Sequence, residues 1–277
     1  MPDKVVVVRS IGSTIRFHCA DERLAAKLSY LAATPEMDLT NDAVANVRTF
    51  KADSGFYDFQ APYGGSPGTT SHLLMRGHVL LRRILIDEAG SAPVVHCASL
   101  VVSGKRILVV ADKGAGKTTL SLKSLASGLT VEGDEHVAVW DDGVMARPRS
   151  LRVKQGTLRQ VPELAGRVVK CPAIEDWNGD RIYSFEPATK EVPWRINRGK
   201  ANFLVFLTSN HGGLTSCHQI SKSKAFNRLL KNVYLPDSGR AAALGRLHTL
   251  ACQTETIEMR LGCLDTAIAY LRALPGL

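Results

Sequence analysis

The stretch Ala111-Asp112-Lys113-Gly114-Ala115-Gly116-Lys117-Thr118-Thr119 lies between the apolar residues 107–110 and a helix-forming segment that begins at Leu120. Small residues let backbone N–H groups converge on phosphate oxygens, and the following helix points its positive end at the anion. Lys117 is placed to reach the β- and γ-phosphates, and Thr118 offers a hydroxyl to Mg²⁺. The stretch matches Gly-x-x-x-x-Gly-Lys-Ser/Thr except at its first residue, Ala111. It predicts a nucleoside triphosphate site over residues 112–119, and a plain glycine-rich turn is the alternative.

The composition favours anionic partners and a reducing compartment. The 277 residues include 35 Lys and Arg against 26 Asp and Glu, a formal net charge of +9. The scattered cysteines form no Cys-x-x-Cys pair and have no nearby His at metal-ligand spacing, so we expect free thiols. No apolar run reaches the length of a membrane span, and no signal-peptide core is present. We expect a cytoplasmic protein with no membrane partner.

A two-residue connection decides the topology around the glycine-rich loop. Residues 93–102 and 105–110 are predicted strands, and only Ser103-Gly104 separates them, so they must be antiparallel neighbours. The common doubly wound nucleotide-binding folds reach this loop from a parallel strand, so the hairpin predicts a mixed sheet. A second hairpin is predicted for 137–140 and 144–146, around Asp141-Asp142-Gly143.

The remaining pattern predicts an α/β chain with two parts. Strands are expected at 5–8, 13–17, 129–131, 182–185 and 203–207, and helices at 21–31, 71–86, 222–230, 241–249 and 265–274. The segment 61–69 holds two Pro and three Gly in nine residues and is predicted to be a loop. We therefore divide the chain into a small N-terminal α+β module, 1–68, and a body, 69–277.

Acidic residues follow the predicted strand at 129–131. Asp134 and Glu135 lie about sixteen residues beyond Thr118, at the end of a strand expected next to the glycine-rich loop. Asp134 is the candidate base for an acceptor hydroxyl, and Asp134 or Glu135 is a candidate to hold Mg²⁺ together with Thr118. A solvated turn is the alternative for both. The competing pair Asp141-Asp142 is explained by turn chemistry alone.

His96 completes a pattern that resembles the HPr kinase/phosphorylase-like proteins. The pattern has a His and small residues in a strand (His96-Cys97-Ala98-Ser99), a turn, the glycine-rich loop, a helix ending at Gly128, and the acids 134 and 135. The resemblance covers residues 93–145 well and the C-terminal helices, from Leu261-Gly-Cys-Leu-Asp265 on, more loosely; there the chain is similar to HPr-kinase-like proteins of peptide-modification gene clusters. It implies the mixed-sheet P-loop fold shared with PEP carboxykinase.

The resemblance also implies roles for individual residues. It places the catalytic base on Asp134, the second acid on Glu135, the phosphate-binding lysine on Lys117 and the metal-binding hydroxyl on Thr118. His96 falls on a family histidine that lies against the catalytic carboxylate, whereas an isolated His in an apolar strand is otherwise a core residue. The chain departs from the family in having Ala111 for Gly, Lys113 for a small hydroxyl residue and Glu135 for Asp. The N-terminal region does not resemble that of true HPr kinases, so HPr is not the expected substrate.

Two basic segments offer further groups for the site. Arg147, Arg149, Arg152, Lys154 and Arg159 form the first. Arg195, Arg198 and Lys200 form the second, which we expect to supply a residue at the nucleotide because it precedes the strand at 203–207. A solvated strand face is the alternative for each residue.

These observations lead to one main functional hypothesis and two others. The main one is an ATP- and Mg²⁺-dependent kinase that phosphorylates a hydroxyl group of a peptide, a protein or a small metabolite. The departures at 111, 113 and 135 motivate the alternative of a nucleotide-binding regulatory protein without turnover. The charge of +9 alone prompts a nucleic-acid-directed enzyme, which no standard signature supports. Related proteins often assemble, so a homo-oligomer remains open.

Overall fold

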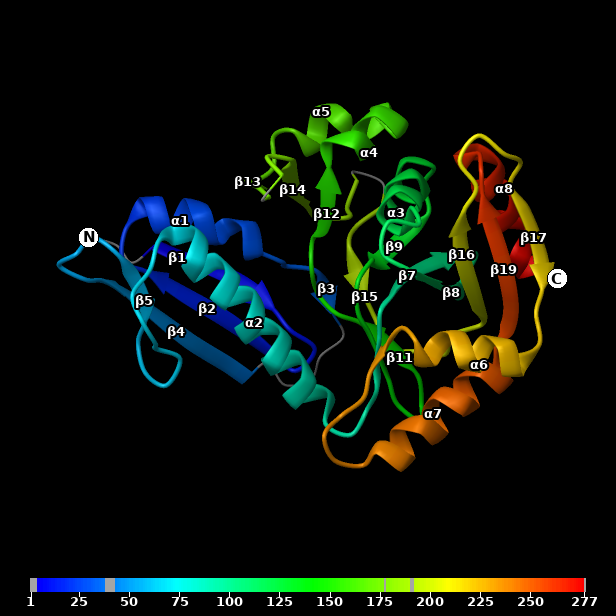
Figure 1. Ribbon diagram of the computed structural model, residues 1–277, viewed down its shortest axis with the longest axis horizontal. Coiled ribbons are helices and arrows are strands. Elements are labelled where there is room, and N and C mark those ends of the chain that lie inside the picture. Colours follow the sequence, from blue (N-terminus) through cyan, green and yellow to red (C-terminus); the bar gives the residue numbers. More distant parts are fainter. Residues whose placement is uncertain (1–3, 38–42, 177, 190–191, 277) are drawn as a thin grey trace.

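A mixed six-stranded sheet with the order β17-β19-β16-β8-β7-β9 forms the centre of the larger lobe (Figure 1). The computed structural model describes residues 4–37, 43–176, 178–189 and 192–276. The sheet comprises β7 (Cys97–Val102), β8 (Lys105–Ala111), β9 (Thr130–Gly133), β16 (Phe203–Ser209), β17 (Ser216–Gln219) and β19 (Glu255–Leu261). Strands β8, β16 and β19 are parallel, whereas β7 and β17 run antiparallel to their neighbours. The prediction of a mixed sheet is confirmed.

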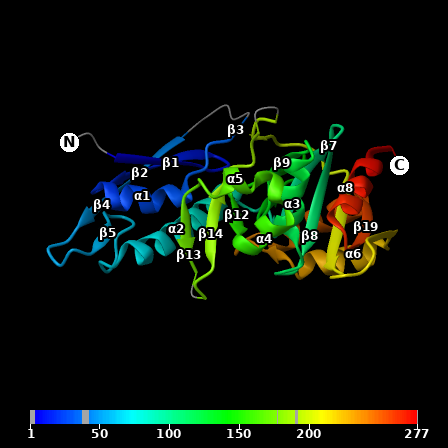
Figure 2. The ribbon, with the colours of Figure 1, turned by 90° about the horizontal axis from the view of Figure 1, so that it is seen from above.

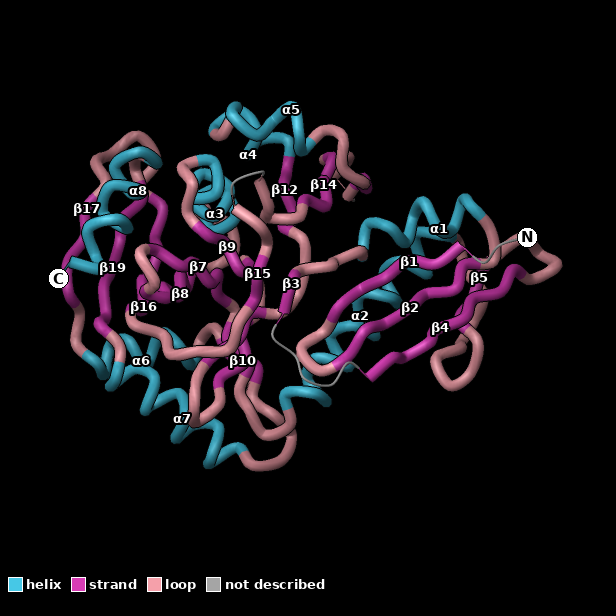
Figure 3. Tube along the Cα trace, turned by 180° about the vertical axis from the view of Figure 1, so that it is seen from behind, coloured by secondary structure: helices cyan, strands magenta, loops and turns pink. Residues whose placement is uncertain are grey.

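Helices cover both faces of this sheet. Side chains alternate between the faces along each strand, and apolar residues on both faces need a partner to bury them. Leu108 and Val110 of β8 belong to the core beneath α6 (Lys222–Leu230) and α7 (Arg240–Gln253). The alternate residues of β8 belong to the core beneath α3 (Lys117–Ala126) and α8 (Leu264–Ala273). Helices α6 and α7 lie side by side in Figures 1 and 3. The bounds of α6 match the prediction, and α7 and α8 lie within a few residues of theirs.

The predicted hairpin into the glycine-rich loop is present. Strand β7 pairs antiparallel with β8, and Ser103 and Gly104 have φ values of 48° and 75°. Two successive left-handed residues are the geometry of a tight I′ turn, which Gly adopts without strain. The strand predicted for 93–102 is interrupted at His96. Its first part, β6 (Val94–Val95), joins a separate sheet, and the His96 N–H donates to the Asn232 carbonyl.

That separate sheet has the order β11-β10-β6-β18 and contains the second predicted hairpin. Its other strands are β10 (Val137–Val139), β11 (Val144–Ala146) and β18 (Val233–Tyr234). Strand β10 pairs antiparallel with β11, and the Trp140 N–H donates to the Gly143 carbonyl across the turn. The turn at residues 141–143 is therefore as predicted.

The N-terminal lobe is a four-stranded sheet with helices on one face (Figure 2). The sheet contains β1 (Lys4–Arg9), β2 (Ser13–Cys19), β4 (Ala43–Lys51) and β5 (Tyr57–Phe59); α1 (Glu22–Leu28), a 3-10 turn (Ser29–Leu31) and α2 (Thr70–Ala89) complete the lobe. Helix α2 buries Leu73, Leu74 and Leu81 in the same core as the strands β1 and β2. The boundary near residue 68 stays a prediction, and in the structure the helix that follows it lies against the N-terminal sheet.

The remaining elements lie between the lobes and above the central sheet. A three-stranded sheet contains β12 (Leu151–Lys154), β13 (Ala173–Glu175) and β14 (Arg181–Phe185). Between β12 and β13 the chain forms α4 (Gln155–Gln160), a 3-10 turn (Pro162–Leu164) and α5 (Ala165–Val168). Strand β3 (Glu36–Met37) pairs with β15 (Arg195–Ile196), and Leu274–Gly276 ends the described chain as a 3-10 turn. Within the described ranges, no helix combines the length and the apolar character needed to cross a membrane.

A buried ion pair joins β8 to β9. Arg106 is 8% exposed and Glu132 is 2% exposed, and the Arg106 guanidinium donates to both carboxylate oxygens at 2.8 Å. The same carboxylate accepts a hydrogen bond from Ser99 of β7 at 2.5 Å, and the Glu132 carbonyl accepts one from the Trp194 ring at 2.9 Å. The pair therefore connects three adjacent strands of the central sheet to the segment that enters β15.

We expect Glu132→Gln to lower the free energy of unfolding by about 3 to 5 kcal/mol, because it leaves the buried Arg106 charge without its partner. Urea unfolding followed by circular dichroism measures the change. Glu163→Gln is the control, because Glu163 pairs with Lys123 at the surface and its loss should cost less than about 1 kcal/mol. Equal effects of the two substitutions would contradict this account of the buried pair.

Candidate functional site

The glycine-rich loop connects the carboxyl end of β8 to the N-terminus of α3. Gly114 and Gly116 have φ values of 86° and 97°, in the left-handed region that favours glycine. A Cβ atom on Gly116 would lie 3.0 Å from Leu261 of β19, whereas one on Gly114 would meet no atom within 4 Å. The loop thus needs both glycines for its backbone and the second also for its close approach to β19. The loop leads directly into α3, whose first residue is Lys117.

Ala111, the departure from the consensus, fits its position. It is the last residue of β8, pairs in register with Leu207 of β16, and does not have a positive φ. Its methyl group is buried in the core beneath α3. An extended backbone accepts any L-residue, so Ala in place of Gly at this position leaves the path of the loop unchanged.

Thr118 and Asp134 come together at the base of the loop. Thr118 is in the first turn of α3, and Asp134 directly follows β9 and is 7% exposed. The Thr118 hydroxyl donates to an Asp134 carboxylate oxygen at 2.7 Å. The structure therefore places the predicted metal-binding hydroxyl against the predicted catalytic carboxylate, although they are sixteen residues apart.

Lys117 and His96 form the second polar pair of the site. Lys117 Nζ lies 3.0 Å from His96 Nε2, so the ammonium donates and the ring accepts. Burial, and then the charges of Lys117 and Arg149, lower the pKa of His96 to about 4, so the ring is neutral at pH 7. Burial also lowers the pKa of Lys117. His96 thus lies against the lysine, and it orients that lysine from the break between β6 and β7.

Glu135 and residues of the first basic segment lie beside the glycine-rich loop. Glu135 forms an ion pair with Arg149, whose pKa burial lowers to about 9. Arg152 is held by the N-terminal lobe: its guanidinium donates to the Tyr30 carbonyl at 2.6 Å and lies 3.7 Å from the centre of the Tyr30 ring. The role of Glu135 as a metal ligand stays a prediction, because in the structure its carboxylate faces an arginine.

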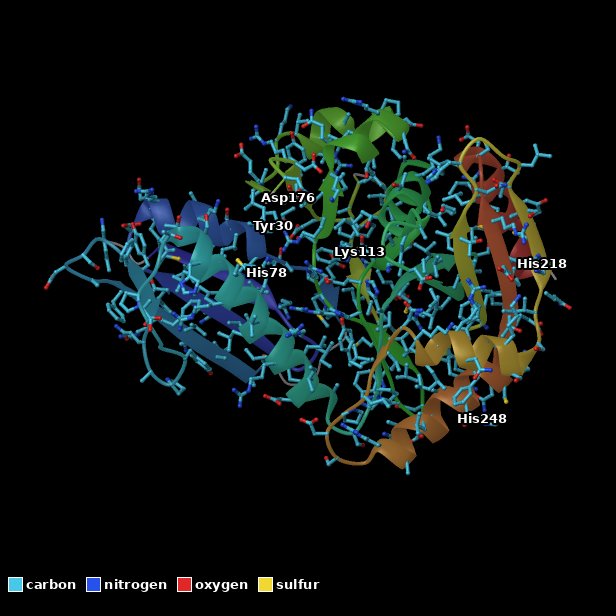
Figure 4. The ribbon with its side chains drawn as sticks, in the orientation of Figure 1. Tyr30, His78, Lys113, Asp176, His218 and His248 are labelled. Carbon is cyan, nitrogen blue, oxygen red and sulfur yellow. The ribbon has the colours of Figure 1, made fainter. Side chains whose placement is uncertain are left out.

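Together these residues line a cleft of about 390 Å³. The predicted site residues that line it are His96, Asp112, Lys113, Gly114, Gly116, Lys117, Thr118, Thr119, Asp134 and Glu135. The cleft is also lined by Arg149, Arg152 and Lys154 of the first basic segment and by Thr157, which was not among the predicted residues. Ala115 packs against the core beneath α3 and, among the predicted site residues, is the one absent from this lining. Figure 4 places Lys113 at the side of the larger lobe that faces the N-terminal lobe.

The second basic segment lies elsewhere, contrary to our expectation. Arg195 pairs with Glu36, and Arg198 pairs with Asp142 and stacks on Trp140. Lys200 lines a different cleft of about 330 Å³ beside the turn at 141–143. We expected this segment near the glycine-rich loop because it precedes β16. However, it lies at the amino end of β16, whereas the loop lies at the carboxyl end of the parallel strand β8. The first segment supplies the cations instead.

A smaller recess of about 170 Å³ adjoins the cleft, and Glu135 and Arg149 line both. The other residues that line the recess are His78, Val79 and Arg82 of α2, with His136, Arg147 and Tyr234. Burial, and then the charges of nearby arginines, lower the pKa of His78 to about 3. Both lobes therefore contribute side chains to the recess.

The oxygen and cation donors of the cleft suit a magnesium triphosphate. Mg²⁺ takes oxygen ligands and commonly keeps waters, so one hydroxyl and one or two carboxylates beside the phosphates suffice. The cleft presents the Thr118 hydroxyl and the Asp134 carboxylate together, with Lys117 on the same helix turn. Among the described residues, no group of three or more His, Cys, Asp or Glu has the arrangement of a self-contained metal site.

Comparisons with known proteins leave the function open. No family model matches the chain, and no curated protein matches it. Among solved structures, the HPr(Ser) kinase/phosphatase from Coxiella burnetii matches with a TM-score of 0.29 and 10% sequence identity, over 66% of this chain and 93% of that one. A likeness of this degree assigns neither residues nor an activity to the chain.

The pKa of His78 gives the folded protein a pH dependence. The folded ring is neutral down to about pH 3, whereas the unfolded ring binds a proton near pH 6.5. The stabilising contribution is therefore complete above pH 6.5 and is lost as the pH falls toward 3. We expect His78→Gln to reduce the loss of unfolding free energy between pH 7 and pH 5 by about 1 to 2 kcal/mol.

Urea unfolding at both pH values measures this difference. His72→Gln is the control, because His72 is exposed to solvent in the first turn of the same helix. An unchanged pH dependence in His78→Gln would contradict a neutral, partly buried His78.

Proposed function

We propose that this chain is a kinase that binds ATP with Mg²⁺ at residues 112–119 and transfers the γ-phosphate to a hydroxyl group of a peptide, protein or small metabolite. The observation that carries the proposal is the Thr118–Asp134 hydrogen bond at the base of the glycine-rich loop. It brings a hydroxyl suited to Mg²⁺ and a carboxylate suited to a hydroxyl proton to the same end of the cleft. A structural turn alone would not require the two groups to meet in an open cleft of this size.

The chain's own residues account for binding the triphosphate. The N-terminus of α3 and the loop amides favour phosphate oxygens, and Lys117 supplies a cation on the first turn. Neutral His96 accepts a hydrogen bond from Lys117 and so fixes the direction of the ammonium without adding charge. Thr118 and Asp134 would hold Mg²⁺, which when bound neutralises charge on the phosphate oxygens.

Asp134 is the residue proposed to act on the acceptor. A carboxylate that lines the cleft at the base of the loop can accept the proton of an incoming hydroxyl as the oxygen attacks the γ-phosphate. Arg149 and Arg152 line the same cleft opposite the loop, where a guanidinium can bind the oxygens of the transferred group. Arg149 and Arg152 are partly buried, which lowers the local dielectric constant and strengthens that interaction.

The first test is nucleotide affinity. Lys117→Met is expected to weaken binding of a non-hydrolysable ATP analogue by about tenfold or more, because a charge-assisted contact to phosphate is lost. Calorimetric titration in the presence of Mg²⁺ measures the dissociation constant. Lys105→Met is the matched control, because Lys105 is an exposed lysine at the start of β8, away from the cleft. Analogue binding unaffected by Lys117→Met would refute the proposed site.

The second test separates catalysis from binding. With an acceptor that supports turnover, Asp134→Asn is expected to lower kcat by about 10² to 10⁴ while the analogue still binds, because the amide cannot take the hydroxyl proton. ADP formation and phosphorylated acceptor are measured together. Asp142→Asn, in the exposed turn, is the control and should keep wild-type kcat. Phosphate transfer at the wild-type rate by Asp134→Asn would contradict the assignment of the base. Tight ATP binding without a phosphorylated product for any acceptor would favour a nucleotide-binding regulatory protein.

A further inference from the structure

The recess beside the cleft gathers the guanidinium groups of Arg82, Arg147 and Arg149, and their charge is only partly compensated. Arg147 is 8% exposed, and its guanidinium makes no hydrogen bond or ion pair within the part of the chain that the structure describes. The acid that acts on it is Glu88, through a longer-range attraction that is weaker than the repulsion from neighbouring arginines. Arg149 has one carboxylate partner, Glu135, and its buried Nε has none. The recess thus presents more buried positive charge than its own residues compensate.

The uncompensated arginine charge lowers the stability of the folded protein unless a further group pairs with it. Burial, and then repulsion from Arg152 and Arg82, lower the pKa of Arg147 to about 10. Uncompensated charge in a low-dielectric position destabilises the folded state, so buried arginines normally have carboxylate partners. The histidines that face the recess do not supply one: His78 and His136 are held neutral, and the buried Nδ1 of His136 has no hydrogen-bond partner. The missing component is an anion.

The nucleotide does not explain the recess. No residue of the glycine-rich loop lines it, and its volume of about 170 Å³ is below the 300 to 1,000 Å³ usual for whole ligands. The recess nevertheless opens beside the cleft, since Glu135 and Arg149 line both. A molecule bound in the recess would therefore lie against Glu135, the residue next to Asp134 in the chain.

We propose that the hydroxyl-bearing acceptor also carries a carboxylate or phosphate group, and that Arg82, Arg147 and Arg149 bind this anionic group in the recess. The planar guanidinium matches either group through paired hydrogen bonds. The inference rests on the proposed kinase function for the fate of the hydroxyl, but the anion site stands on its own contacts. It also gives the N-terminal lobe a role, because α2 contributes Arg82 and His78; Figure 4 shows His78 and Tyr30 where this lobe faces the larger one.

The test titrates inorganic phosphate and succinate into the full-length protein, with the glycine-rich loop first filled by a non-hydrolysable ATP analogue and Mg²⁺. At least one anion is expected to bind, and Arg82→Gln and Arg147→Gln are each expected to weaken that binding by about tenfold or more. Arg83→Gln is the matched control: it is the next residue of α2, also exposed, and outside the recess, so the affinity should stay unchanged. Tighter phosphate binding assigns a phosphate group, and tighter succinate binding a carboxylate.

Failure of both anions to bind, or binding that is the same in all variants, would overturn the anion site. Arg82 is exposed on α2, so its variant keeps the test decisive if Arg147→Gln does not fold. Acceptor preference provides the second readout: serine peptides with acidic or phosphorylated neighbours should show a KM about tenfold lower than uncharged peptides, and Arg82→Gln should remove that preference. Equal KM values would contradict the inference. Absence of ATP binding contradicts the proposed function instead, and the anion titration, repeated without nucleotide, is read independently of it.

Discussion

The buried pair between Arg106 and Glu132 determines where the catalytic candidates lie. It joins β8, which leads into the glycine-rich loop, to β9, which leads into Asp134. Because Ser99 of β7 and the Trp194 ring bind the same glutamate residue, the pair fixes the register of three strands and of the segment before β15. The Thr118–Asp134 contact depends on that register, since Asp134 directly follows β9 and Thr118 follows β8 by way of the glycine-rich loop.

A second constraint is the positive charge between the lobes. Arg147, Arg149 and Arg152 come from a short stretch of the larger lobe, and burial lowers the pKa of each. Tyr30 of the N-terminal lobe covers Arg152 through its carbonyl and its ring, and α2 covers Arg147 from the side. The N-terminal lobe therefore lines the recess and holds one arginine of the cleft, Arg152.

Much of the central site could be predicted from the sequence because its signals are local. The Ser103-Gly104 turn, the glycine-rich loop and the acids after β9 each lie within a few residues of the strand that positions them. Strand β19 was not predicted, although it pairs in parallel with β16, because parallel neighbours lie far apart in the chain. For the same reason, the sequence did not predict that α2 packs against the N-terminal sheet, or which of the two basic segments lines the cleft. Arg152 is held at the cleft by Tyr30, which lies 122 residues before it in the chain.

Hydrogen–deuterium exchange with and without an ATP analogue and Mg²⁺ tests the central claim most directly, because it locates the bound nucleotide on the chain. The account predicts slower exchange in peptides that cover residues 112–119 and 132–136, and unchanged exchange around the second cleft at residues 139–144. Protection confined to residues 139–144, or no protection of the glycine-rich loop at saturating analogue, would contradict it.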